Sequence, residues 1–202
     1  MSSDLSPHRP HLRSLLFLPG NRTSEWLPKA QAAGTDAVIL DLEDTLPDAE
    51  RTSAVEQVTE AIAPRTSGPA LFVRVTPLDD WTAAGDLRAV CRPGLSGIVL
   101  PKVTGPHDIR VVDRLLGWCE REHGLPQGHF ALLPLLETAT ALRDAHGCAT
   151  AADRVACLGA ITGAGGDVGR AVGYRWSPEG RETHALRARS CSTHEQPEPH
   201  IR

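Results

Sequence analysis

The sequence predicts an α/β fold of the (β/α)8 TIM-barrel type, incomplete, with about six βα units present. Short apolar runs rich in β-forming residues alternate with longer stretches of helical composition, which favours a parallel sheet with right-handed crossovers. Acidic residues follow several of these runs, at the strand ends where a barrel carries its site. The alternation by itself also fits an open, doubly wound sheet, which remains the alternative.

Three strand–helix pairs are expected in the first half of the chain. The run AVILDL is nearly all apolar, as a strand buried on both faces should be. Gly34 and Pro64 follow the first two helical stretches and end them. The expected strands are 12–18, 37–42 and 70–75, and the expected helices are 24–33, 49–62 and 80–90.

The second half continues the pattern. The run GIVL ends at Pro101, and FALLPLL is followed directly by Glu137. After Asp167, the stretch YRWSPEGRETHALRARS supplies a turn and the start of a further helix. The expected strands are 97–100, 130–136 and a weaker sixth at 154–159, with helices at 106–123 and near 138–146.

The chain is expected to have three parts: a polar N-terminal extension at 1–11, a partial barrel domain at 12–190 and a polar tail at 191–202. The tail nearly lacks apolar residues, so it cannot form a barrel strand. Because a complete barrel usually takes ~250 residues, we expect a barrel truncated at its C-terminus. An open sheet of this kind would leave strand edges exposed.

Composition narrows the class of protein. Apolar residues make up 41% of the chain and charged residues 23%, which is typical of a soluble globular domain. The net charge of −4 and the lack of a basic run argue against nucleic acid as a partner. No secretory signal or bilayer-length apolar run is present, and the five cysteines show no C-x-x-C pair. We therefore expect a cytoplasmic protein with reduced thiols and no membrane partner.

Carboxylates at three strand ends would converge at one mouth if the barrel forms. Asp41, Glu43 and Asp44 lie in DLED, Glu137 follows PLL, and Asp167 follows a glycine-rich turn. Mg²⁺ prefers one or two carboxylates together with water and substrate oxygens, which Glu137 and Asp167 could supply. The alternative is that each carboxylate caps the helix after it. For the set as a whole we predict a metal site.

Cationic residues near the same ends suit an anionic ligand. Arg74 interrupts the apolar run LFVRV, where a charge is costly to bury unless it is paired. It either points into the mouth and binds a carboxylate or faces outward between helices, and alternation does not decide between them. Arg22 and Lys29 flank the first turn and helix, although such residues singly are more often solvated surface charges. Gly166 belongs to a turn, GAGGD, that permits close backbone approach to a ligand.

Taken together, these residues resemble the HpcH/HpaI aldolase and citrate lyase β-subunit superfamily. The resemblance lies in six segments in order, which are RSLLFLPGNR, GTDAVILDLED, LFVRV, GIVLPKV, LLPLLETA and GAGGDVGRAVG. It implies a (β/α)8 barrel, a homo-oligomer (trimer or hexamer) and Mg²⁺ as cofactor. It also implies two further strands and a C-terminal segment that this chain lacks, since the similarity ends at about residue 190.

The resemblance further implies roles for individual residues. Glu137 and Asp167 would bind Mg²⁺, and Arg74 would hold the substrate's carboxylate or carbonyl end. The remaining implied positions are Phe17, Arg22 and Lys29 along the CoA or acyl-carrier-protein thioester, Gly166 against the substrate, and Glu43 and Asp44 orienting metal-bound waters.

The implied activity is a Mg²⁺-dependent carbon–carbon lyase. It would cleave a malyl-, citramalyl- or citryl-thioester to an acyl-thioester and a 2-oxo acid. Two alternatives remain, namely a truncated and inactive member of the family and an aldolase acting on a free hydroxy-dicarboxylate.

Overall fold

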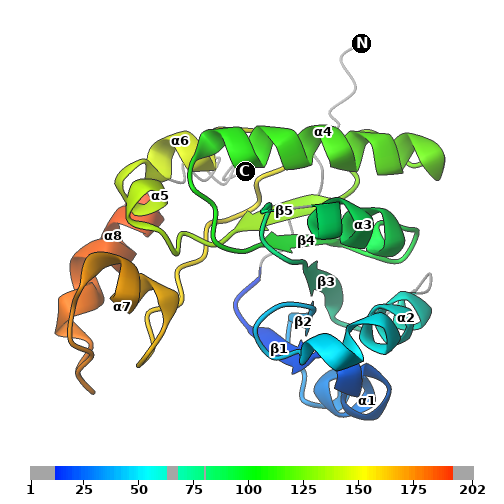
Figure 1. Ribbon diagram of the computed structural model, residues 1–202, viewed down its shortest axis with the longest axis horizontal. Helices are drawn as coiled ribbons and strands as arrows, with labels where there is room; N and C mark the ends of the chain where they lie inside the picture. Colours follow the sequence, from blue (N-terminus) through cyan, green and yellow to red (C-terminus); the bar gives the residue numbers. More distant parts are fainter. Residues whose placement is uncertain (1–11, 63–67, 80, 193–202) are drawn as a thin grey trace, which may run out of the picture.

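The computed structural model describes residues 12–62, 68–79 and 81–192, so the predicted extension at 1–11 and most of the predicted tail lie outside the described residues. Its centre is a parallel sheet whose strands follow one another in chain order (Figure 1). The strands are β1 (Leu15–Pro19), β2 (Ala37–Asp41), β3 (Ala70–Arg74), β4 (Gly97–Leu100) and β5 (Ala131–Pro134).

Four longer helices connect these strands and pack on one another in succession (Figure 1). They are α1 (Thr23–Ala32), α2 (Arg51–Ala61), α3 (Trp81–Val90) and α4 (Pro106–Glu122), with short 3-10 turns η1 (Gly20–Arg22) and η2 (Asp48–Glu50) before α1 and α2. A sheet in strict chain order with successive helix packing is the winding of a barrel. The doubly wound alternative is therefore wrong, because it requires a point where the strand order reverses.

The two faces of the sheet carry separate apolar layers. One layer packs under the helices and includes Val38, Leu40 and Val73. The other covers the inner face and is made of Ala37, Ile39, Phe72, Val99, Leu133 and Leu135, with Phe17 packed against it. Since side chains alternate along a strand, Asp41 and Arg74 fall on this inner face, two residues beyond Ile39 and Phe72.

The predicted sixth strand at 154–159 is only partly correct. This segment lies beside β5 through two isolated parallel bridges, Leu132 with Val155 and Leu135 with Gly159, but it forms no continuous strand. The cause is Pro134, which has no N–H to donate across to this segment. The carbonyl of Pro134 accepts the N–H of Gly159. The pairing also shifts by one residue along the segment, because bridged residues are 23 apart in sequence at Leu132–Val155 and 24 apart at Leu135–Gly159.

The last part of the described chain is built from short helices. The single helix expected near 138–146 is two, α5 (Ala139–Arg143) and α6 (Ala145–Ala149), separated at Asp144, whose carboxylate caps α6 by accepting the N–H of Gly147. Then come α7 (Asp167–Val172), the turn η3 (Arg181–Thr183) and α8 (His184–Ser192). Within the described residues no helix has the length and apolarity needed to cross a bilayer.

Candidate functional site

The carboxyl ends of the strands gather a cluster of charged side chains, and Arg74 lies at its centre. Arg74 is 4% exposed and donates from Nε to Asp41 Oδ1 at 2.6 Å and from Nη2 to Asp41 Oδ2 at 2.7 Å. The two residues are direct partners in the β2–β3 register, which sets up this two-point contact. The outward-facing alternative for Arg74 is therefore wrong. Three of its five N–H groups are donated to Asp41 and Asp44, which leaves donors for a ligand.

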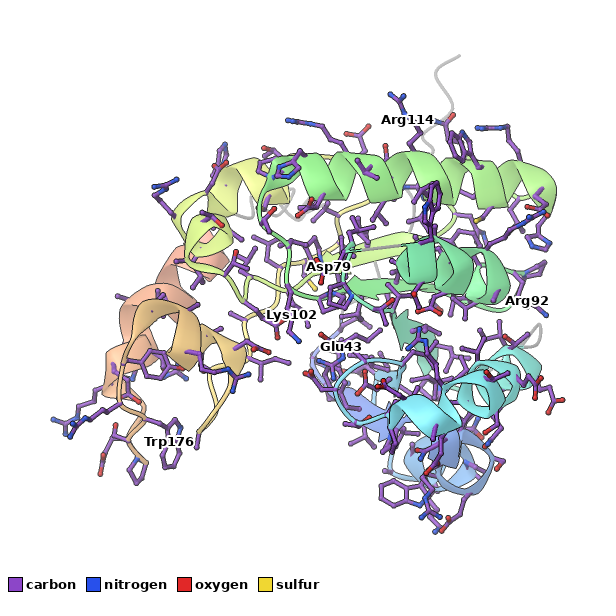
Figure 2. The ribbon with its side chains drawn as sticks, viewed as in Figure 1. Glu43, Asp79, Arg92, Lys102, Arg114 and Trp176 are labelled. Atoms are coloured by element: carbon purple, nitrogen blue, oxygen red, sulfur yellow. The ribbon has the colours of Figure 1, made fainter. Side chains whose placement is uncertain are left out.

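Glu43 and Asp44, in the loop after β2, are each bridged by two cations. Arg74 Nη1 lies 2.9 Å from Glu43 and 3.2 Å from Asp44. From the loop after β4, Lys102 Nζ lies 2.7 Å from Glu43 and 3.2 Å from Asp44 (Figure 2). The four side chains form a closed ring of alternating charge that ties the β2 and β4 loops together.

Glu137 is held by the backbone rather than by a cation. It follows β5, is 3% exposed, and one carboxylate oxygen accepts the N–H of Lys102 at 3.0 Å. The cap of α5 is Thr138, whose hydroxyl accepts the N–H of Ala141, so the capping alternative for Glu137 is wrong. Burial raises the pKa of Glu137, and the nearby negative charge of Asp167 adds to that effect.

Asp167 is the first residue of α7 and faces the same cluster. One of its oxygens pairs with Arg170, one turn later, and the other lies 3.8 Å from Lys102 Nζ. Lys102 therefore contacts Glu137 through its N–H and approaches Asp167 through its ammonium, which brings the two predicted metal ligands to one residue.

The pKa values of the cluster follow from its burial and charges. Burial raises the pKa of Glu43 to about 7, because two buried oxygens without well-directed hydrogen bonds are only partly compensated by Lys102 and Arg74. Burial also opposes ionisation of Asp41, but hydrogen bonds from Arg74 and Thr45 outweigh it and lower that pKa. Desolvation lowers the pKa of Lys102, yet its ion pairs with Glu43 and Asp44 leave it above the ordinary lysine value.

These residues fit a divalent cation. The charged side chains joined by these contacts are five carboxylates and three cations, namely Asp41, Glu43, Asp44, Glu137 and Asp167 against Arg74, Lys102 and Arg170. Negative charge is in excess, and Glu137 is a buried carboxylate whose hydrogen-bond donor is a neutral backbone group. Within the described ranges, no group of three or more His, Cys, Asp or Glu side chains is arranged to hold a metal ion by itself. Two carboxylates completed by water and substrate oxygens are the coordination that Mg²⁺ prefers.

The other predicted positions divide into two groups. Phe17 on β1 lies beneath Arg74, with the guanidinium carbon 5.1 Å from the ring centroid, so it belongs to the cluster. Arg22 and Lys29 instead form exposed ion pairs with Glu25, at 3.6 and 3.1 Å, which is the surface-charge alternative. Gly166 precedes α7 in a tight turn, where a Cβ would lie 3.2 Å from the carbonyl oxygen of Ile161.

The contacts of Lys102 with these carboxylates were not predicted from the sequence. Lys102 stands in the motif GIVLPKV, where a lysine directly after a buried strand and a proline was the available signal. Lys102 is the one described non-glycine residue with a left-handed backbone, at φ 50°. The partnership of Asp41 with Arg74 was also missed, because it depends on strand register.

The fold and this cluster define a class: a parallel barrel-type α/β protein with an acid-rich, arginine-anchored site at the carboxyl ends of its strands. The model of the HpcH/HpaI aldolase/citrate lyase family matches residues 13–197. The chain therefore belongs to that family.

Individual relatives agree. Citrate lyase subunit beta of Leuconostoc mesenteroides subsp. cremoris is 32% identical over 144 residues, covering 71% of this chain and 47% of the relative. A citrate lyase subunit beta-like protein of Deinococcus radiodurans is 37% identical over 142 residues, covering 66% of this chain and 46% of the relative. The chain thus spans about half the length of the curated relatives it matches.

Solved structures show the same fold. The M. tuberculosis citrate lyase beta subunit, complexed with oxaloacetate and magnesium, superimposes with a TM-score of 0.67 at 22% identity, over 92% of this chain and 74% of that one. Haloferax volcanii malate synthase superimposes with a TM-score of 0.75 at 18% identity, over 90% of this chain and 59% of that one. This confirms the barrel-type fold, which is incomplete in the described chain.

Proposed function

We propose that this chain carries the site of a Mg²⁺-dependent carbon–carbon lyase acting on a hydroxyacyl thioester. The substrates proposed are malyl-, citramalyl- or citryl-thioesters of CoA or an acyl-carrier protein, and the products are an acyl-thioester and a 2-oxo acid. The observation that carries the proposal is Glu137, a buried carboxylate at the end of β5, held by a backbone N–H near Asp167 and Arg74. Family membership and the magnesium-bound relative support it.

In this proposal the acidic residues bind the metal and its waters, and Arg74 binds the substrate. Glu137 and Asp167 would hold Mg²⁺, which when bound acts as a Lewis acid toward the substrate's hydroxyl and carboxylate oxygens. Arg74, fixed by Asp41, has donors left to bind the carboxylate or thioester carbonyl end. Glu43 and Asp44 would orient water at the metal from the loop after β2.

The reaction then follows from this placement. A base removes the hydroxyl proton, the hydroxyl carbon becomes a carbonyl, and the adjacent carbon–carbon bond breaks with its electrons moving into the thioester as an enolate. A fixed guanidinium stabilises that developing charge without having to reorganise, which is the part proposed for Arg74. Protonation of the enolate carbon gives the acyl-thioester.

Phe17, Arg22, Lys29 and Gly166 remain proposed substrate-side positions. Phe17 is supported by its contact with Arg74. Arg22 and Lys29 are exposed beside α1 and would have to leave Glu25 to meet a thioester carrier. The cytoplasmic location and the trimeric or hexameric assembly stay predictions.

Purified chain incubated with Mg²⁺ and each CoA-ester tests the proposal. Trapping the 2-oxo acid with phenylhydrazine and titrating free thiol with a disulfide reagent separates lysis from thioester hydrolysis. We expect 2-oxo acid without free thiol, abolished by EDTA. Free thiol alone would indicate a hydrolase, and 2-oxo acid from a free hydroxy-dicarboxylate would indicate an aldolase. No product from any substrate would mean that the chain is inactive by itself.

A further inference from the structure

Lys102 contacts most of the carboxylates around Arg74, which no sequence pattern indicated. Its left-handed backbone, at φ 50°, is uncommon for a residue with a side chain and is favoured at functional sites. In this conformation its N–H points to Glu137 while its ammonium extends to Glu43, Asp44 and Asp167. One residue therefore contacts four of the five carboxylates of the site.

We propose that Lys102 is a built-in cation that competes with the divalent metal for Asp167 and so tunes how tightly the site holds that metal. The inference rests on the proposed function, because it takes Glu137 and Asp167 as the metal's ligands. The ammonium lies 3.8 Å from Asp167, on the oxygen that Arg170 does not use. When a metal binds that oxygen, two like charges are brought together and the ammonium moves away.

The molecule has room for that movement. A cavity of about 120 Å³ lies directly beside Lys102, with two further carboxylates in its wall. Figure 2 shows Asp79, one of these, in the same central region as Lys102 and Glu43. The cavity is lined by Leu78, Asp79, Leu100, Pro101, Lys102, Val103, Thr104 and Asp108. An ammonium displaced from Asp167 thus stays in an acidic environment, and its N–H can keep holding Glu137.

Substitution separates competition from a structural role. Lys102→Met removes the ammonium and keeps the N–H, and Lys102→Gly does the same while relieving the left-handed backbone. Without the competing charge, both variants should bind Mn²⁺ about tenfold more tightly, measured by electron paramagnetic resonance without substrate. Lys102→Arg keeps the charge and should bind as the wild type does. A variant that merely loosened the site would bind metal more weakly.

A matched control removes a charge elsewhere. Arg88 forms an exposed ion pair with Glu122 between α3 and α4, outside the proposed site. Arg88→Met changes the net charge by the same amount as Lys102→Met, and it should leave Mn²⁺ affinity unchanged. Equal tightening in both variants would show a general charge effect and overturn the proposal.

The wild-type chain offers an independent measurement, since Lys29 and Lys102 are its only lysines. With ¹³C-labelled lysine, Mg²⁺ titration should shift the Lys102 signal while Lys29, paired with Glu25 on α1, stays fixed as an internal reference. A Lys102 signal that does not move while Mg²⁺ binds would overturn the competition. If the wild type binds no divalent cation at all, the proposed metal site itself fails, which is a different outcome.

Discussion

Two buried arginines of the described residues each centre a charged cluster, Arg74 at the carboxyl ends of the strands and Arg154 near the amino end of β5, and the two clusters differ in how their charges are matched. Arg154 donates to Glu120 from two nitrogens, at 2.5 and 3.1 Å, and to Asp113 at 2.6 Å. Glu120 also accepts the backbone N–H groups of Gly128 and Phe130, just before β5. Despite burial, these hydrogen bonds lower the pKa of Glu120.

In the cluster around Arg74, at the carboxyl ends of the strands, the hydrogen bonding of the buried acids is less complete. Around Arg74, both carboxylate oxygens of Glu43 are buried without a hydrogen-bond partner, and burial raises the pKa of both Glu43 and Glu137. A cluster that serves only the fold is expected to be satisfied, as the Arg154 cluster is. Buried acids with raised pKa values are instead typical of sites that await a ligand. This difference supports the proposal that the Arg74 cluster is a functional site, whereas the Arg154 cluster stabilises the fold.

The largest expected effect comes from a substitution in the Arg154 cluster. Arg154→Met leaves Glu120 buried at 1% exposure without its cation, so we expect the free energy of unfolding to fall by about 3–5 kcal/mol. Chemical denaturation of the variant and wild type measures this. Activity per folded molecule should not change, and a loss of turnover without a loss of stability would remove the distinction between the two clusters.

The next largest effect is a loss of turnover on substitution of Glu137 in the Arg74 cluster. Glu137→Gln keeps the shape of the side chain and its acceptor for the Lys102 N–H but removes the charge that would hold Mg²⁺. We expect lyase turnover to fall by about 10²–10³-fold, as when one preorganised electrostatic contact is lost. Stability in EDTA should stay the same or rise, because burial already opposes ionisation of Glu137.

A matched control for that experiment is Glu122→Gln. Glu122 is a half-exposed carboxylate paired with Arg88 on the helical surface, and its neutralisation should leave turnover unchanged. If Glu137→Gln retained full activity, Glu137 would not be a metal ligand.

The sequence predicted the fold well because its signals are local. Apolar runs and helix-ending glycines and prolines located five strands and four long helices with only small differences at their ends. The sixth strand was overestimated, since the effect of Pro134 on pairing with 154–159 depends on which residues face each other. The division of the helix near 138–146 likewise depends on the capping contact made by Asp144.

The site was predictable only in part. The carboxylates and Arg74 stand at strand ends, so parallel topology brings them together. The Asp41–Arg74 pairing depends on β2–β3 register, and the contacts of Lys102 depend on one left-handed residue. Neither depends on residue type alone, which is why the contacts of Lys102 and the direction of Arg74 could not be predicted from the sequence.

The third expected effect is a pH dependence of stability that distinguishes the two clusters. Burial raises the pKa of Glu43 to about 7 in the folded chain. The folded state therefore binds the Glu43 proton more tightly than the unfolded state, and this contribution to stability is fully present at low pH and is lost as pH rises toward 7. Glu43→Gln mimics the protonated form at every pH. In EDTA, the wild type should lose stability relative to this variant between about pH 4.5 and 7, by about 1.4 kcal/mol for each unit of pKa difference at most.

Denaturation of both proteins at several pH values measures that slope. Glu120→Gln provides the contrast, since the pKa of Glu120 is lowered. Its carboxylate stabilises the fold at neutral pH, and that stability is lost as pH falls through the lowered pKa, so its slope has the opposite sign. If the difference in stability from the wild type changed with pH in the same way for both variants, the two clusters would not differ in how their buried acids are stabilised. The proposal that the Arg74 cluster is the functional site would then lose its electrostatic support.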